Sequence, residues 1–164
     1  MELVNPGALP PNLRGRRVLA AIVFTDIATS GTRMAIAERH TLDLIHRDFQ
    51  LMTRLCERFE GQVLKTLGDG LLMYFASAVQ AVECAQEIQQ TLTETAAALP
   101  PQDVLYHRIG IHLGDVLFSE TDVMGNGVNI AARLQTEAKP GGICLSQTIY
   151  DVVKSCLHFK VDYL

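Results

Sequence analysis

The sequence predicts a single domain of the α+β class, in which helices pack on a mainly antiparallel sheet. Three observations lead to this prediction. A continuous apolar run at 18–24 is typical of a buried strand, a helical pattern of apolar residues follows over 42–59, and a glycine-flanked turn at 68–70 joins two short apolar runs. At 164 residues with 48% hydrophobic content, the chain can bury one core.

The amino-acid composition limits which binding partners and which cellular compartment we expect for the chain. The net charge is −4 and no block of Lys or Arg follows one face, so nucleic acid is not an expected partner. The four cysteines show no C-x-x-C spacing, which favours buried free thiols in a reducing compartment. The run at 18–24 is too short to cross a bilayer, and residues 1–17 lack the apolar segment of a signal peptide. We expect a cytoplasmic domain whose parent chain could be membrane-anchored.

The N-terminal part of the chain divides into an arm and a first strand. Residues 1–16 are expected to form a linker or N-terminal arm, because prolines and a glycine within 5–12 disfavour a helix or a central strand. The folded domain is expected over 17–164. Its first run, Val18 to Phe24, predicts a strand buried on both faces that ends at Thr25-Asp26.

A long helix and a hairpin are expected next. Beyond Ser30-Gly31, apolar residues recur at three- and four-residue steps up to Phe59, which predicts an amphipathic helix ending near Gly61. Two short apolar runs, 63–64 and 71–75, flank Gly68-Asp69-Gly70, whose glycines can adopt the positive φ of a tight turn. This pattern predicts a β-hairpin with an acidic residue at its tip.

The second half of the chain alternates helices and strands. We expect helices over 78–98 and 128–138, strands over 106–118 and 143–145, and a short helix from an N-cap at Ser146 through Val153. Residues 159–163 are expected to form a strand that the chain end interrupts. The order strand, long helix, hairpin, helix, strand, helix, strand fits an α+β sandwich close to the ferredoxin-like plan, with helices covering one face of the sheet.

Two carboxylates are expected to meet at neighbouring strand ends. Asp26 follows the first strand, and Asp69 lies in the hairpin turn that the topology brings beside it. A pair of carboxylates without His or Cys suits Mg²⁺ or Mn²⁺, with water and substrate phosphates as the remaining ligands. The alternative is that Asp26 caps the following segment and Asp69 only suits the turn.

Two further segments carry candidate ligand-binding groups. The small residues after Asp26, including Thr29, Ser30 and Gly31, could offer backbone N–H groups to a phosphate, or could simply cap the long helix. Lys65 lies in an otherwise apolar strand, where its ammonium group either points into a polar cleft or reaches solvent at the sheet edge.

Asn129 and Arg133 are spaced i, i+4 and therefore share one face of the predicted third helix. The guanidinium could hold phosphate oxygens and the amide could bind a sugar oxygen. Most helices carry an exposed polar stripe, which is the alternative. A Gly-Asn-Gly segment before the helix and Asp122 upstream favour a site.

Three stretches of the chain together resemble the class III nucleotidyl cyclase catalytic domain, of the bacterial adenylate cyclase type. The likeness runs from about Arg17 to the C-terminus, and the last stretch is the most specific. The stretches are Val23-Phe24-Thr25-Asp26-Ile27, Leu64-Lys65-Thr66-Leu67-Gly68-Asp69-Gly70, and Asp122-Val123-Met124-Gly125-Asn126-Gly127-Val128-Asn129-Ile130-Ala131-Ala132-Arg133-Leu134.

The resemblance implies a role for each candidate residue. Asp26 and Asp69 would bind two Mg²⁺ or Mn²⁺ ions, with the Ile27 carbonyl as a further ligand. Lys65 and Asp122 would read the purine edge, Asn129 would orient the ribose, and Arg133 would stabilise charge on the phosphates. A Lys and Asp pair suits adenine, so ATP is the expected substrate.

The implied reaction is the conversion of ATP to 3′,5′-cyclic AMP and pyrophosphate, which is a phosphorus–oxygen lyase reaction in signal transduction. The resemblance also implies a homodimer with shared sites, and regulatory domains in a longer parent chain. The chain stops before the last strands and the triphosphate lysine of the family, so we expect a C-terminally truncated domain. Open alternatives are a guanylate cyclase and a catalytically silent dimerisation or regulatory module; a diguanylate cyclase ranks low, because the hairpin lacks its G-G-[DE]-E-F motif.

Overall fold

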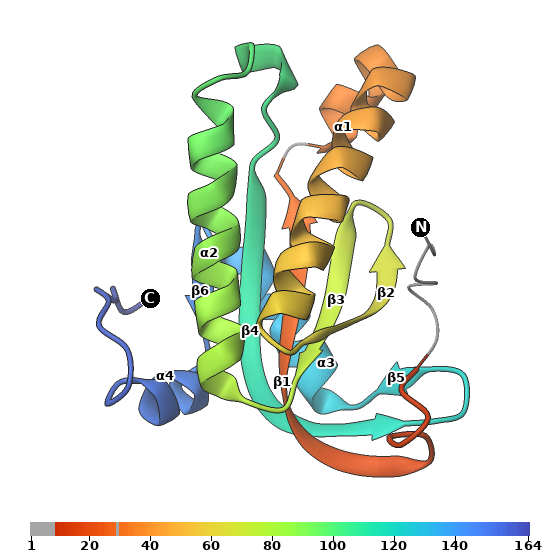
Figure 1. Cartoon of the computed structure of the whole chain (residues 1–164), viewed down its shortest axis with the longest axis vertical. Coiled ribbons are helices and arrows are strands. Elements are labelled where there is room, and N and C mark those ends of the chain that lie inside the picture. Colours follow the sequence, from red (N-terminus) through yellow and green to blue (C-terminus); the bar gives the residue numbers. More distant parts are fainter. Residues whose placement is uncertain (1–8, 29) are drawn as a thin grey trace.

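The computed structural model describes residues 9–28 and 30–164, and for 30–37 it describes the backbone only. Within these residues the chain forms a mixed sheet with strand order β2-β3-β1-β4-β5, and β6 pairs with β4 beside this path. Helices α1 and α2 lie side by side on the near face of the sheet, and α3 lies behind it (Figure 1). The α+β class and the mainly antiparallel sheet are confirmed.

The central strand is β1, Arg16–Ile27, which pairs antiparallel with both β3 and β4. Residues 20–23 are at most 1% exposed, which confirms a strand buried on both faces. The predicted end at Thr25-Asp26 is wrong, because the ladder with β4 continues to the pair Ile27 and His107. Asp26 is therefore a strand residue rather than a residue after the strand.

The helix and hairpin that follow match the prediction. Helix α1 spans Ser30–Arg58, β2 spans Gln62–Leu67 and β3 spans Gly70–Phe75. Gly68 has φ +59°, the left-handed conformation that a glycine adopts without strain. The tip of this hairpin lies at the same end of the sheet as the end of β1 (Figure 1).

The remaining elements also follow the expected order. Helix α2, Ala78–Ala96, is capped at its N-terminus by Ser77, whose side chain accepts a hydrogen bond from the Gln80 N–H. A short 3₁₀ helix at Pro101–Asp103 leads to β4, His107–Phe118, then β5, Val123–Met124, and α3, Asn126–Glu137. Strand β6, Ile143–Leu145, runs parallel to β4, and α4, Gln147–Val153, has the predicted Ser146 cap. The two-residue strand β5 was not predicted.

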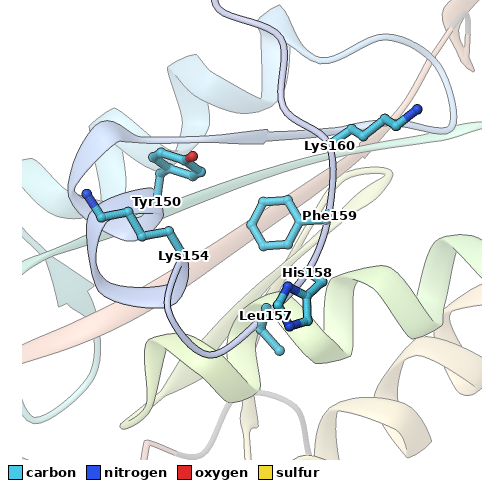
Figure 2. A pocket seen from close by; sticks show the side chains of 6 residues that line it. All are labelled: Tyr150, Lys154, Leu157, His158, Phe159 and Lys160. Carbon is cyan, nitrogen blue, oxygen red and sulfur yellow. The ribbon is translucent and has the colours of Figure 1, made fainter.

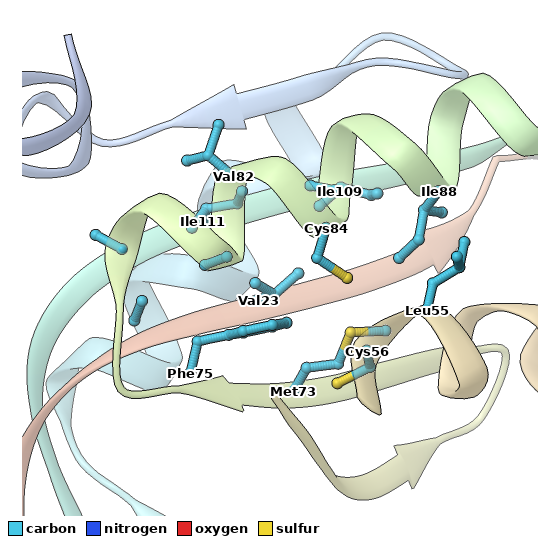
Figure 3. Close-up of a cluster of buried hydrophobic side chains, with 14 of the residues drawn as sticks. Val23, Leu55, Cys56, Met73, Phe75, Val82, Cys84, Ile88, Ile109 and Ile111 are labelled. Carbon is cyan, nitrogen blue, oxygen red and sulfur yellow. The ribbon is translucent and has the colours of Figure 1, made fainter. Parts of the chain in front are cut away.

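Two apolar cores cover the two faces of the sheet. The larger core lies between the sheet and helices α1, α2 and α4, and Figure 3 shows side chains of α2 meeting those of β1, β3 and β4. The second lies between the opposite face and α3, and it includes Leu9 and Leu13 of the N-terminal arm, which are 4% and 8% exposed. The expectation that helices cover only one face is therefore wrong, and the last residues of the arm pack on the domain.

The C-terminal segment differs from its prediction. Residues 157–164 form no strand. Leu157 and Phe159 instead pack against the larger core, and the Phe159 ring meets Tyr150 edge to face with centroids 6.4 Å apart. A cavity of about 440 Å³ lies between this segment and α4 (Figure 2). It shares no residue with the candidate site described below.

The cysteine prediction is correct at Cys56, Cys84 and Cys144, which are buried free thiols, and wrong at Cys156, which is exposed. Burial raises the pKa of each buried thiol. Among the described residues, no helix has both the length and the apolar character needed to cross a membrane.

Candidate active site

Asp26 and Asp69 come together at one end of the sheet. Asp26 lies near the end of β1, and Asp69 lies in the turn between β2 and β3. Burial is the largest effect that raises the pKa of Asp26 to about 6, and a hydrogen bond and charge repulsion with Asp69 add to it. The Ile27 N–H donates a hydrogen bond to Asp26 Oδ1 over 2.8 Å, and this bond lowers the pKa of Asp26, against the effects of burial and Asp69. Two carboxyl groups therefore share one small volume.

Two residues that were not singled out in the sequence also reach Asp26. Arg108 is its cross-strand partner on β4, and the Arg108 Nη2 atom lies 3.5 Å from Asp26 Oδ2. Gln135 of α3 donates to the same oxygen from Nε2, also over 3.5 Å. Gln135 is only 2% exposed, so this amide is held in a buried position. Neither contact leaves a signal in the sequence, because each depends on strand register or helix docking.

The carboxylate pair fits a hard divalent cation. Its oxygens repel one another, and a cation between them would relieve that repulsion. In the described part of the chain, no group of three or more His, Cys, Asp and Glu side chains could hold a metal ion. An ion bound by Asp26, Asp69 and the Ile27 carbonyl would thus need water or substrate phosphates to complete its ligand set. The Ile27 side chain is 3% exposed and packs with Leu44 and Leu105, which holds this end of the strand.

Lys65 and Asp122 form a direct ion pair although 57 residues separate them. Lys65 Nζ donates to Asp122 Oδ1 over 2.8 Å, and both side chains remain partly exposed. This hydrogen bond is the main cause that lowers the pKa of Asp122. A turn holds the carboxylate in place, because the Asp122 N–H donates to Ser119 Oγ and Asp122 Oδ1 accepts from the Val123 N–H. Lys65 therefore has a polar partner rather than only solvent.

Asn129 and Arg133 lie on the exposed side of α3. The helix buries Gly127, Ala131 and Gln135 against the sheet, and residues 129 and 133 lie between these positions on the opposite side. Within the described part of the chain, neither side chain makes a hydrogen bond or an ion pair. The structure therefore does not bring them onto Asp26 or Asp69 of the same chain.

The proposed phosphate-binding segment is only partly visible. Thr29 lies outside the described residues. Ser30 and Gly31 form the start of α1, where only the backbone is described. Their role stays a prediction.

Comparison with known proteins places this arrangement in a family. The sequence profile of the Adenylate and Guanylate cyclase catalytic domain matches residues 16–164. The chain belongs to this family. A protein of Rhizobium meliloti (strain 1021) named "Putative adenylate cyclase 3" is 39% identical over 140 residues, which cover 84% of this cyclase domain and 24% of the relative.

Solved structures agree with the family assignment. An adenylate/guanylate cyclase/hydrolase from Silicibacter pomeroyi is 33% identical, covers 87% of this chain and 83% of its own, and superposes with a TM-score of 0.77. The guanylyl cyclase Cya2 has the same fold, with a TM-score of 0.73 at 24% identity, 85% coverage of this chain and 80% of its own. This cyclase domain spans about a quarter of the length of the Rhizobium relative, so that relative is a much longer chain.

Proposed function

We propose that this cyclase domain converts ATP to 3′,5′-cyclic AMP and pyrophosphate. The observation that carries the choice of ATP over GTP is the ion pair between Lys65 and Asp122, whose polar atoms lie 2.8 Å apart. Adenine presents an acceptor at N1 beside a donor at its 6-amino group. An ammonium next to a carboxylate matches this pattern, whereas the corresponding edge of guanine reverses it.

The chain's own residues supply most of the positioning. Lys65 and Asp122 would hold the purine, and Asn129 would hold the ribose so that its 3′-oxygen faces the α-phosphorus. A new bond then forms between these atoms, the bond to pyrophosphate breaks, and the proton of the 3′-hydroxyl passes to solvent. Arg133 and Arg108 would counter the growing negative charge on the phosphate oxygens. Two Mg²⁺ or Mn²⁺ ions at Asp26, Asp69 and the Ile27 carbonyl would neutralise phosphate charge and favour loss of that proton.

The positions of Asn129 and Arg133 support a symmetric homodimer. Both side chains lie on the side of α3 that faces away from its own sheet, and neither contacts the Asp26 and Asp69 pair of its own chain. A second copy could present them to that pair, and two-fold symmetry would then create two such shared sites. A monomer is expected to be inactive.

The context of the domain is also a proposal. The Rhizobium relative is matched over 24% of its length, which supports regulatory domains in a longer parent chain. A need for ATP favours action in the cytoplasm. A silent regulatory module is the second candidate, but the presence of both carboxylates favours catalysis.

The test is cyclic nucleotide formation at high protein concentration, with ATP and GTP compared in Mg²⁺ and in Mn²⁺. We expect cyclic AMP chiefly from ATP. Asp26→Asn and Asp69→Asn should each lower turnover by at least about a hundredfold, while Asp162→Asn, at an exposed position, serves as the matched control. Unchanged turnover in either site variant would contradict the metal assignment, and equal use of GTP would contradict the substrate assignment.

A further inference from the structure

At its tip, the hairpin that carries Asp69 is joined to β1 by a side-chain hydrogen bond rather than by regular strand pairing. Regular pairing between β1 and β3 runs from Ala21 and Phe75 to Phe24 and Leu72, and it stops there. One residue further, the Leu71 N–H donates to the side-chain oxygen of Thr25 over 2.9 Å. Thr25 is fully buried and Leu71 is 2% exposed, so water does not compete for this bond.

The same junction brings the two backbones into contact. A Cβ atom on Gly70 would lie 1.9 Å from the Thr25 carbonyl oxygen, which no side chain can tolerate. Gly70 and Thr25 are the direct neighbours of Asp69 and Asp26 in the chain. This contact therefore limits how closely the backbone segments that carry the two carboxylates approach each other.

The two carboxylates are held by different means. Asp26 belongs to the continuous ladder between β1 and β4, which fixes its backbone. Asp69 lies in a turn beside Gly68, and the β1–β3 ladder ends before it. Loss of the Thr25 hydroxyl would leave the Leu71 N–H buried without an acceptor, which is energetically costly. The hairpin tip would have to move for this N–H to reach another acceptor or water.

We propose that Thr25 is a positioning residue that sets the spacing between Asp26 and Asp69 through its hydrogen bond to Leu71. This inference rests on the proposed function, because it assumes that the two carboxylates hold divalent cations. Thr25 is fully buried, and in this proposal it acts on the two carboxylates only through the hairpin.

The test compares Thr25→Val, which keeps the shape but removes the hydroxyl, with Thr25→Ser, which keeps the hydroxyl. The first readout is hydrogen exchange at the Leu71 amide relative to Leu72. The second is Mn²⁺ affinity without nucleotide, measured by electron paramagnetic resonance. We expect both to change by about tenfold in Thr25→Val, with faster exchange and weaker binding, and by less than about threefold in Thr25→Ser.

A matched control separates positioning from a general loss of stability. Ile22→Val removes a buried methyl group from the same strand without touching the Leu71 bond, so it should lower the melting temperature and leave Mn²⁺ affinity unchanged. A general stability effect would weaken Mn²⁺ binding in this control as well, and that result would overturn the inference.

The experiment distinguishes this inference from the proposed function. If Asp26→Asn abolishes Mn²⁺ binding and Thr25→Val binds as tightly as the wild type, the inference alone fails. If the wild type and Asp26→Asn bind Mn²⁺ equally, the metal assignment fails and the inference fails with it.

Discussion

At the scale of single residues, Asp26 occupies a position that opposes its own ionisation. Its pKa is raised from 3.8 to about 6, first by burial and then by Asp69, and Arg108 offsets only part of this effect. Between these pKa values the folded state binds more protons than the unfolded state. The contribution of Asp26 to stability therefore falls as the pH rises from about 4 to about 6.

Because the ionised Asp26 carboxylate destabilises the folded state, removing its charge in Asp26→Asn should stabilise the protein in the absence of divalent cations. We expect the variant to raise the free energy of unfolding by about 1 kcal/mol at pH 7.5, a value reduced for solvent screening of a partly exposed group. The gain should shrink towards zero near pH 4, where the native carboxyl group is already neutral. Urea unfolding in EDTA at both pH values measures it. A variant less stable than the wild type at pH 7.5 would contradict this account.

A second prediction concerns the role of Lys65 in the preference for ATP over GTP. Lys65→Glu replaces the donor of the 2.8 Å ion pair by a second acceptor beside Asp122. We expect the ratio of kcat/KM for ATP to that for GTP to fall by at least about tenfold, because adenine N1 loses its donor. Lys154→Glu is the matched control, since Lys154 is largely exposed and its ion pair with Asp151 lies outside the candidate site. An unchanged ratio in Lys65→Glu would refute the purine-reading role.

The residues that escaped prediction share one property. Arg108, Gln135 and Thr25 are each defined by a partner distant in sequence, and residue type alone does not reveal such partners. The proximity of Asp26 and Asp69 could be predicted because two carboxylates near neighbouring strand ends are chemically conspicuous. The polar contacts around them require the register of β1 on β4 and the docking of α3, which periodicity does not supply.

At the scale of elements, α3 shows how small residues allow close packing. The helix crosses β4 at Gly110, where a Cβ atom would lie 2.3 Å from the Gln135 nitrogen and 2.4 Å from the Ala131 oxygen. Both are backbone atoms, so no side chain can rotate away. The absence of a side chain at Gly110 thus lets the helix lie directly on the strand and bring Gln135 to Asp26.

Gly110→Ala should force α3 away from the sheet. We expect a loss of about 2 kcal/mol or more in the free energy of unfolding, measured by urea titration. Gly114→Ala on the same strand is the control, since its Cβ would lie 3.0 Å from the His112 side chain and would meet α3 only at an ordinary contact distance, 3.5 Å from the Gly127 Cα atom. Equal losses in the two variants would show that α3 does not depend on close approach at Gly110.

Periodicity predicted the long elements well and the short ones poorly. The three- and four-residue steps of α1 and the unbroken apolar run of β1 are strong signals, because each repeats over many residues. Strand β5 has two residues, too few to show any period. Residues 159–163 look like a strand in sequence, but in the structure they form none, and Phe159 packs on the core together with Leu157.

At the scale of the whole molecule, the candidate residues form two contact pairs and a third, separate pair of positions on α3. Asp26 and Asp69 form a contact pair, and Lys65 and Asp122 form another. Asn129 and Arg133 contact neither pair within the described residues. The site proposed above, which uses all six residues, would therefore need either a large rearrangement or a second copy of the chain.

Mixing inactive variants tests the second possibility. Asp26→Asn mixed with Arg133→Ala should recover about a quarter of wild-type cyclase activity, because half of the dimers then hold one intact site of two. Asp26→Asn mixed with Asp69→Asn is the control and should recover nothing, since both changes affect the same half of every site. Recovery in the control, or none in the first mixture, would contradict the shared-site dimer.

The ladder between β1 and β4 also limits the positions at which residues can be inserted or deleted. It pairs twelve residues of each strand without interruption, from Arg16 and Phe118 to Ile27 and His107. Because side chains alternate between faces, an insertion of one residue in either strand would turn Asp26 or Arg108 towards the opposite core. Insertions and deletions in homologous domains should therefore avoid these strands and gather in the connection between α2 and β4.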